Sequence, residues 1–230
     1  MDIRARIQDV KDRIAAAAGR SGRDPRSVTL LAVTKTFPVE ALRQAHAAGL
    51  RLFGENRVQE ALVKQPLLPA DIEWHLIGQL QTNKINKVLG RFGLIQSVDS
   101  LHLAKALSAR LTEDQEVLLE VNTSGEASKA GFAPQELPRA FDEALGLPRL
   151  KVRGLMTVGP LTQEGEARRR AFRTLRSLFD GVKGRAPEPA AFSILSMGMS
   201  GDFEEAIEEG STLVRVGSAL FGERPAPKKD

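Results

Sequence analysis

The sequence predicts an α/β protein built as a single (β/α)₈ barrel, the TIM-barrel architecture, with an extra helix at its N-terminus. Short apolar runs alternate with amphipathic stretches along 230 residues, a usual length for one such barrel. The alternation occurs eight times, and strict strand–helix alternation implies parallel strands joined by right-handed crossovers. Most runs are continuously apolar, as expected of strands that are buried on both faces.

An open doubly wound sheet is the competing architecture. Such sheets usually have fewer strands, and their first turn is rich in glycine. The first turn here is Thr34-Lys35-Thr36, which has no glycine. The barrel is therefore favoured.

The first elements follow from periodicity and from helix-breaking residues. Apolar residues recur at helical spacing from Asp2 to Ala18, so residues 1–24 are expected to form a leading helix and turn. The run VTLLAVT at 28–34 is apolar and β-branched, which indicates a buried strand. Pro38 suits the first turn of the next helix, and Gly49 suits its end.

The same pattern predicts the remaining elements. Seven further strands are expected at Arg51–Phe53, Ile72–Ile77, Gly93–Val98, Glu116–Val121, Val152–Val158, Phe192–Leu195 and Thr212–Val216. Helices are expected after them at about Glu55–Lys64, Thr82–Leu89, Ser100–Leu111, Pro134–Leu145, Glu164–Val182 and Asp202–Glu209, with a helical turn at Ser218–Phe221. Residues 223–230 contain two prolines and are expected to form a flexible tail, so 1–230 is predicted to be one domain.

Composition excludes several classes of protein. Cysteine is absent, which rules out disulfides, thiolate metal sites and a cysteine nucleophile and fits a reducing compartment. No signal peptide or membrane-length apolar run is visible, so a cytoplasmic protein is expected. The net charge of +4 is small and scattered, which argues against nucleic-acid binding. One arginine cluster at 168–176 has helical spacing beside acidic residues, and we interpret it as a solvated helix face.

The ends of the last two predicted strands resemble a phosphate site. In such barrels the active site lies at the C-terminal ends of the strands, and phosphate often binds after strands seven and eight. Ser196 and Ser200 supply hydroxyl groups there, and Gly217 permits close backbone approach before the turn at Ser218. Either segment alone is more typical of helix caps and turns. Their combination at these two positions favours a phosphate-bearing ligand.

Lys35 is the second informative residue, because it directly follows an apolar strand. Desolvation lowers the pKa of a lysine and makes its neutral amine available to an aldehyde. A lone lysine at a strand end is usually an ion-pair partner, but one beside a phosphate site suggests a ligand with both an aldehyde and a phosphate. Pyridoxal 5′-phosphate (PLP) is the obvious candidate, and a Schiff-base aldolase acting on a sugar phosphate is the alternative. The three histidines lack metal-ligand spacing, and His75 is expected in the core or supporting the site.

Several segments together resemble the pyridoxal phosphate homeostasis protein family. They are LLAVTKT around Lys35, FGENRVQE at 53–60, EWHLIGQLQTNK at 73–84, VNTSGEASKAGF at 121–132, VRGLMTVG at 152–159 and SMGMSGDFEEAIEEGSTLVRVGSALFG at 196–222. The resemblance covers residues 28–222 and implies the barrel of the alanine racemase N-terminal domain. Three positions depart from the family's common residues: Ser218 stands in place of threonine, Gly201 in place of aspartate and Arg57 in place of an aromatic residue.

The resemblance implies a role for each matching residue. Lys35 would form the internal aldimine and Arg215 would lie near the pyridine nitrogen. The remaining residues are expected near the ring or the phosphate: Asn56, Met156, Ser196, Met197, Ser200, Gly217 and Ser218. If Lys35 were wrong, Lys84 and Lys129 would be the next candidates for the aldimine lysine.

The function implied is PLP binding and homeostasis in the cytoplasm without established catalysis. The expected partners are PLP and PLP-dependent apo-enzymes, with no nucleic acid and no membrane, and a monomer is expected. The alternatives are a PLP-dependent amino-acid racemase and a Schiff-base aldolase. Barrel racemases use a tyrosine from a second domain, whereas this chain has no tyrosine and no such domain is expected after the eighth strand.

Overall fold

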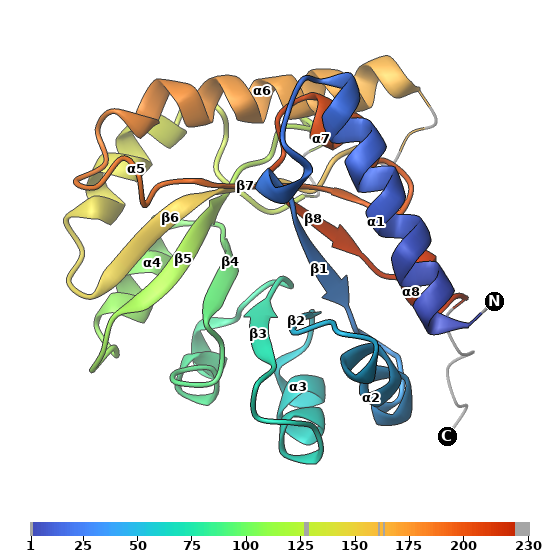
Figure 1. Ribbon diagram of the computed structural model, residues 1–230. Helices are drawn as coiled ribbons and strands as arrows, with labels where there is room; N and C mark the ends of the chain where they lie inside the picture. The colour runs from blue at the N-terminus through green and yellow to red at the C-terminus, as the bar shows by residue number, and fades with distance from the viewer. Residues whose placement is uncertain (1, 127–128, 161, 163, 224–230) are drawn as a thin grey trace.

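The buried apolar runs form the strands of a closed parallel barrel in the computed structural model, which describes residues 2–126, 129–160, 162 and 164–223 (Figure 1). The strands are β1 (Thr29–Val33), β2 (Leu52–Glu55), β3 (Glu73–Leu76), β4 (Leu94–Val98), β5 (Gln115–Glu120), β6 (Leu150–Met156), β7 (Ile194–Met199) and β8 (Leu213–Val216). Each strand pairs with the next along the chain, and β1 pairs with β8. The predicted (β/α)₈ barrel is therefore confirmed.

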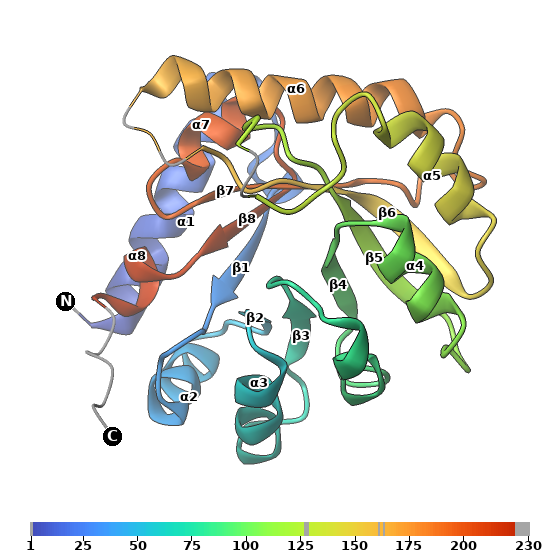
Figure 2. The same cartoon turned by 180° about the vertical axis from the view of Figure 1, so that it is seen from behind.

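Helices surround the strands on the outside of the barrel (Figures 1 and 2). They are α1 (Ile3–Arg20), α2 (Val39–Ala47), α3 (Val58–Lys64), α4 (Leu101–Ser108), α5 (Leu137–Leu145), α6 (Gly165–Lys183), α7 (Phe203–Glu208) and α8 (Ser218–Phe221). Short 3₁₀ turns lie at η1 (Pro25–Ser27), η2 (Gln65–Leu67) and η3 (Thr82–Lys87). Of the predicted tail, only Glu223 lies within the described residues.

Alternate side chains of each strand face either the helices or the barrel interior. The outward side chains join the helices in one large apolar core. Inside the barrel, Leu31, Val33 and Leu213 form one apolar cluster, and Leu94, Leu118 and Met156 form another. Polar residues fill much of the remaining interior, so this barrel has a mixed rather than a purely apolar centre.

Several predicted boundaries differ from the structure by a few residues, and three of the differences have clear local reasons. The helix expected from Thr82 is the 3₁₀ turn η3, because its sequence TNKINK is poor in helix formers and buries only Ile85. The helix expected from Glu55 begins at Val58, because Glu55 is still extended and pairs with Leu76. Strand β7 continues to Met199, since Ser196 is paired in the sheet.

The leading helix is an integral part of the packing. α1 lies against α7 and α8, so the first helix of the chain contacts the last two (Figures 1 and 2). Ile7, Val10 and Ile14 are the buried residues that the helical spacing predicted. This face joins the main apolar core.

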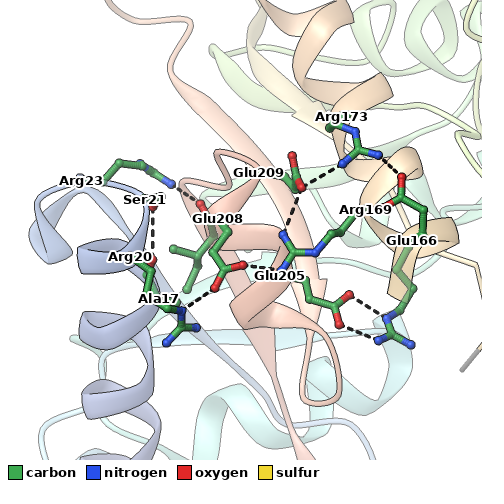
Figure 3. A network of polar contacts seen from close by, with 12 residues as sticks. Ala17, Arg20, Ser21, Arg23, Glu166, Arg169, Arg173, Glu205, Glu208 and Glu209 are labelled. Carbon is green, nitrogen blue, oxygen red and sulfur yellow. Dashed lines mark hydrogen bonds and ion pairs between the residues drawn. The ribbon is translucent and has the colours of Figure 1, made fainter. Parts of the chain in front are cut away.

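The arginine cluster of α6 is not simply a solvated face, which corrects that interpretation. Arg168 donates two hydrogen bonds to the Glu205 carboxylate of α7, at 2.9 and 2.6 Å. Arg169 pairs with Glu208 at the end of α7 and with Glu209 just after it (Figure 3). Arg20 of α1 pairs with Glu208 from the other side at 2.6 Å. The acidic face of α7 is thus held between arginines of α1 and α6, a pairing that local charge spacing could not reveal.

Candidate functional site

A cavity of about 290 Å³ opens at the C-terminal ends of the barrel strands. This is close to the lower end of the usual range for ligand pockets, roughly 300 Å³, and suits a small molecule. Six predicted site residues line it: Lys35, Asn56, Ser200, Arg215, Gly217 and Ser218. Val33, Ile77, Val158, Met199 and Gly201 complete the lining. Residues far apart in sequence are brought together because all parallel strands end at the same mouth.

Lys35 lies two residues beyond the end of β1. Leu31 and Val33 face the barrel interior, so the alternation carries the side chain of Lys35 to the cavity above them. Lys35 is half-buried. The next residue, Thr36, has φ 68°, in the left-handed region that is unfavourable for a β-branched residue. The chain therefore turns sharply just after the lysine.

Ser200, Gly217 and Ser218 form the part of the cavity that could hold a phosphate. Ser200 Oγ accepts hydrogen bonds from the N–H of Gly217 at 3.0 Å and of Ala219 at 3.4 Å. Because Oγ acts as acceptor in both, its proton remains for a ligand. A β-carbon at Gly217 would lie 3.3 Å from the Val33 carbonyl oxygen, so this position is tight as well as close to the ligand. The hydroxyl-bearing residues Ser200 and Ser218 thus line one side of the cavity, next to the Gly217 backbone.

Arg215 places a buried positive charge in the cavity wall. Its guanidinium donates to Ser196 Oγ at 2.6 Å and to the Thr157 carbonyl oxygen at 2.7 Å. Burial lowers the pKa of Arg215 to about 10, while the charges of Glu120 and Asp202 oppose this shift. The guanidinium is therefore still protonated at neutral pH and faces the cavity as a fixed donor.

The carboxyl group of Glu120 balances this arginine from the end of β5. Burial raises the pKa of Glu120 to about 7; the charge of Asp99 adds to the rise and that of Arg215 reduces it. Burial also raises the pKa of Asp202 above its ordinary value, although its Oδ1 accepts the Met199 N–H at 2.6 Å. Arg215 in the cavity wall thus interacts with the charges of two carboxyl groups, Glu120 and Asp202, that burial makes harder to ionise and that do not themselves line the cavity.

A chain of hydrogen bonds leads from Arg215 through the barrel interior. Ser196 Oγ accepts from Arg215 and donates to Gln96 Oε1 at 2.7 Å, and Gln96 Nε2 lies 2.9 Å from His75 Nδ1. The other ring nitrogen of His75 lies 3.0 Å from Glu73 Oε1. This geometry assigns the proton of the neutral ring to Nε2. His75 is thus a buried link in a polar chain, consistent with the supporting role predicted for it.

Asn56 presents an acceptor that the protein does not use. Its Oδ1 is buried and has no hydrogen-bond partner among the described residues. Buried polar atoms are rarely left without a partner, so this oxygen fits a donor on a ligand in the cavity. A β-carbon at Gly78 would lie 2.2 Å from the Asn56 carbonyl oxygen, which shows how closely the end of β3 approaches it.

Three predicted site residues do not line the cavity. Ser196 is fully buried behind Arg215, and Met156 is buried in the interior cluster with Leu94 and Leu118. Met197 is fully buried in the main core, on the opposite side of β7 from Ser196. Ser196 reaches the cavity only through the guanidinium that it positions.

The alternative lysines and metal chemistry find no support at this cavity. Lys84 does not line the cavity. Lys129 is also outside the lining, where its Nζ donates to the Gly159 carbonyl oxygen at 2.9 Å and pairs with Glu126. The described residues contain no group of histidine or acidic side chains arranged to hold a metal ion. None of the helices in the described ranges is both long enough and apolar enough to span a membrane.

Comparison with known proteins places the chain in a family. The sequence model of the alanine racemase N-terminal domain matches residues 6–225. The pyridoxal phosphate homeostasis protein of Aquifex aeolicus is 45% identical over 223 residues, covering 95% of this chain and 97% of the relative. That of Pseudomonas aeruginosa is 47% identical over 222 residues, covering 95% and 94%.

Solved structures agree with this assignment. The crystal structure of an unknown protein from Bifidobacterium adolescentis has a TM-score of 0.91 at 42% identity, covering 95% of this chain and 94% of that one. PipY of Synechococcus elongatus, solved with PLP bound, has a TM-score of 0.79 at 39% identity, covering 93% and 100%. Alanine racemase from Corynebacterium glutamicum, at 19% identity and a TM-score of 0.73, shares the fold; the match covers 96% of this chain and 64% of the racemase. This chain belongs to the pyridoxal phosphate homeostasis protein family.

Proposed function

We propose that this chain binds PLP in the cavity at the barrel mouth and serves PLP homeostasis rather than turnover of a substrate. The observation that carries the proposal is the cavity itself, which brings together a lysine, a set of phosphate donors and an arginine. The unused acceptor of Asn56 supports a bound ligand there. The PLP-bound structure of PipY, 39% identical to this chain, supports PLP as that ligand.

Each lining residue has a definite task in this proposal. The neutral amine of Lys35 attacks the PLP aldehyde carbon and water leaves, which gives a reversible covalent bond. The hydroxyl groups of Ser200 and Ser218 donate hydrogen bonds to the phosphate, and Gly217, which has no side chain, lets the phosphate approach the backbone closely. Arg215 donates to the pyridine nitrogen and keeps it unprotonated, because a fixed cation beside the nitrogen opposes a second positive charge. PLP supplies electron withdrawal when bound, and Arg215 weakens it.

Two enzyme classes are the alternatives, a PLP-dependent racemase and a Schiff-base aldolase. Barrel racemases need a second base opposite the lysine, and the tyrosine that serves them is absent from this composition. A cavity with an arginine at the pyridine nitrogen also stabilises a carbanion poorly. Amino acids should therefore react slowly with the bound cofactor, without turnover near the usual range of about 1–1000 per second. Chiral analysis of L-alanine incubated with the PLP-loaded protein tests this.

The binding proposal is tested by borohydride reduction of the PLP-loaded protein followed by peptide mass spectrometry. We expect the reduced PLP adduct on Lys35, and we expect Lys35→Ala to lose both the adduct and the visible absorption band. Lys84→Ala is the matched control and should keep both. A band of full size in Lys35→Ala, still trapped by borohydride, would show that another lysine binds the aldehyde.

We also propose that PLP-dependent apo-enzymes receive the cofactor from this chain, which acts as a monomer in the cytoplasm. Reversible attachment through one lysine supports such a transfer, because a competing amine can release the aldehyde. Loaded protein mixed with an apo-enzyme should activate it faster than PLP dissociates into solution. Activation that never exceeds the rate of free release contradicts direct transfer, and sedimentation velocity tests the monomer.

A further inference from the structure

Lys35 lies between two residues that are both held by charged side chains of α3. Lys64 Nζ donates a hydrogen bond to the carbonyl oxygen of Thr34 at 2.8 Å. Glu60 Oε1 accepts the N–H of Thr36 at 2.6 Å. Lys64 and Glu60 also pair with each other at 2.6 Å. The backbone is therefore fixed immediately before and immediately after Lys35 by one ion pair.

The contact at Thr36 holds an unfavourable conformation. Thr36 has φ 68°, and such a residue persists only when its surroundings fix it. The bond from its N–H to Glu60 is charge-assisted and short, so it opposes relaxation of the turn. If the turn relaxed, the peptide after Lys35 would rotate and change the direction of the lysine side chain.

Glu55 further fixes the position of Lys64 and of Thr34, because its carboxylate accepts hydrogen bonds from both side chains. Its Oε1 accepts from Lys64 Nζ at 2.8 Å and from Thr34 Oγ1 at 2.6 Å. Glu55 is fully buried and Lys64 is 6% exposed. Burial raises the pKa of Glu55, while Lys64 opposes the rise. A buried ion pair contributes little net stability compared with apolar packing, which points to positioning as its effect here.

We propose that Lys64 and Glu60 are positioning residues that aim the amine of Lys35 into the cavity. This inference rests on the proposed covalent role of Lys35. Neither Lys64 nor Glu60 lines the cavity, so they act on the cofactor only through the backbone of residues 34–36. Losing either one should reduce covalent attachment of PLP while sparing the non-covalent contacts with its phosphate.

The test separates covalent attachment from binding. Wild type, Lys64→Met and Glu60→Ala are each titrated with PLP and, separately, with pyridoxine 5′-phosphate, which has the phosphate but no aldehyde. We expect the fraction of bound PLP trapped on residue 35 by borohydride to fall at least tenfold in both variants. Affinity for pyridoxine 5′-phosphate should change less than about twofold. The matched control is Lys105→Met, which should behave as wild type. Lys105 lies on α4, and its Nζ is 3.2 Å from Glu143 Oε2 on α5.

The outcomes distinguish this inference from the proposed function. If a variant loses affinity for PLP and for pyridoxine 5′-phosphate to the same extent, the substitution has disturbed the whole cavity and not the orientation of Lys35. That result overturns the positioning role. Glu60→Ala with wild-type trapping overturns it as well, even if Lys64→Met does not fold. If wild type itself gives no adduct on Lys35, the proposed function fails and this inference fails with it.

Discussion

The buried guanidinium of Arg215 is balanced by carboxyl groups whose own charge is unfavourable. Its pKa is lowered to about 10 by burial, and that of Glu120 is raised to about 7 by burial. Since the Arg215 guanidinium remains protonated, the net charge of the Arg215–Glu120 pair depends on whether the Glu120 carboxyl is ionised. Glu120 is therefore the residue whose ionisation should affect stability near neutral pH.

The first prediction concerns Glu120→Gln and pH. The folded pKa of about 7 lies above the ordinary value of 4.5, so folding favours the protonated carboxyl. Its stabilising effect is complete below about pH 4.5 and is lost as the pH rises through 7. Glutamine stays neutral at every pH. The free energy of unfolding of the variant should therefore rise by roughly 3 kcal/mol relative to that of wild type as the pH increases from below 4.5 to above 7. Urea unfolding of both proteins at pH values on either side of this window measures the gain, and a pH-independent difference would contradict it.

The second prediction concerns Ser200→Ala. A hydrogen bond to a charged group contributes about 1.5–3 kcal/mol, so the variant should bind PLP about tenfold to a hundredfold more weakly. Pyridoxal, which lacks the phosphate, should bind wild type and variant alike. Ser177→Ala, at an exposed position of α6, serves as the control. Equal losses of affinity for the two aldehydes would place Ser200 away from the phosphate.

Helix α7 depends on neighbours from two distant parts of the chain, α1 and α6. Its acidic face meets arginines of α1 and α6 (Figure 3). The segment just before it carries Ser200. Although single surface ion pairs contribute little, linked pairs with partly buried partners contribute more. The network should therefore hold the phosphate side of the cavity in place.

The third prediction tests this network through Glu208→Gln. The change weakens the bonds from Arg20 and Arg169 together, and we expect it to lower the free energy of unfolding by about 1 kcal/mol. Asp180→Asn removes an isolated pair with Arg176 on α6 and should have no measurable effect. The difference between the variants should shrink in about 1 M salt, where charges are screened within a few ångströms. Equal effects would mean that linkage adds nothing.

The fourth prediction concerns two glycines in neighbouring elements. A β-carbon at Gly154 of β6 would lie 1.7 Å from the Ile194 carbonyl oxygen of β7, so Gly154→Ala should cost more than about 3 kcal/mol of stability. Gly181 of α6 has open space around it, and Gly181→Ala should stabilise by roughly 0.5–1 kcal/mol. Thermal unfolding should shift in opposite directions, and a stable Gly154→Ala protein would show that the strands can separate without cost.

Elements were predictable wherever local periodicity decides the structure. The apolar run ending at Thr34 and the helical spacing of Ile7, Val10 and Ile14 carry their own signal. Lys64 and Glu60 do not, because four residues apart they look like any exposed pair on a helix. The contacts of Lys64 with Thr34 and of Glu60 with Thr36 depend on how α3 packs on the barrel.

At the scale of the whole molecule, a polar chain crosses the barrel from its mouth to its opposite end. This series of hydrogen-bonded side chains comes from four strands and consists of Arg215, Ser196, Gln96, His75 and Glu73. It ends at the Glu73 carboxylate, whose side chain is 62% exposed. Most of the predicted site residues line the cavity, because each sits at a recognisable strand end. The interior chain was not predictable, since its contacts depend on which strands lie opposite one another in the closed barrel.

The fifth prediction concerns the middle of that chain. Gln96→Leu leaves His75 Nδ1 without a donor and the Ser196 hydroxyl proton without an acceptor in the barrel interior, although Ser196 Oγ still accepts from Arg215. Each unsatisfied group costs about 1–3 kcal/mol, so the variant should lose roughly 2–6 kcal/mol of stability. Gln79→Leu, at an exposed position by the mouth, should change it by less than about 0.5 kcal/mol. Urea unfolding measures both, and a small loss for Gln96→Leu would mean that the interior readily rearranges.

The pairing of β1 with β8, and of α1 with α7 and α8, affects how the chain emerges from the ribosome. About 180 residues separate the two strands, which at 5–20 residues per second takes roughly 10–40 s to synthesise. During that time β1 has an unpaired edge and α1 has an uncovered apolar face. Exposed edges and apolar faces promote aggregation and are bound by chaperones. A nascent chain stalled before Leu213 should therefore need a chaperone and should not retain PLP.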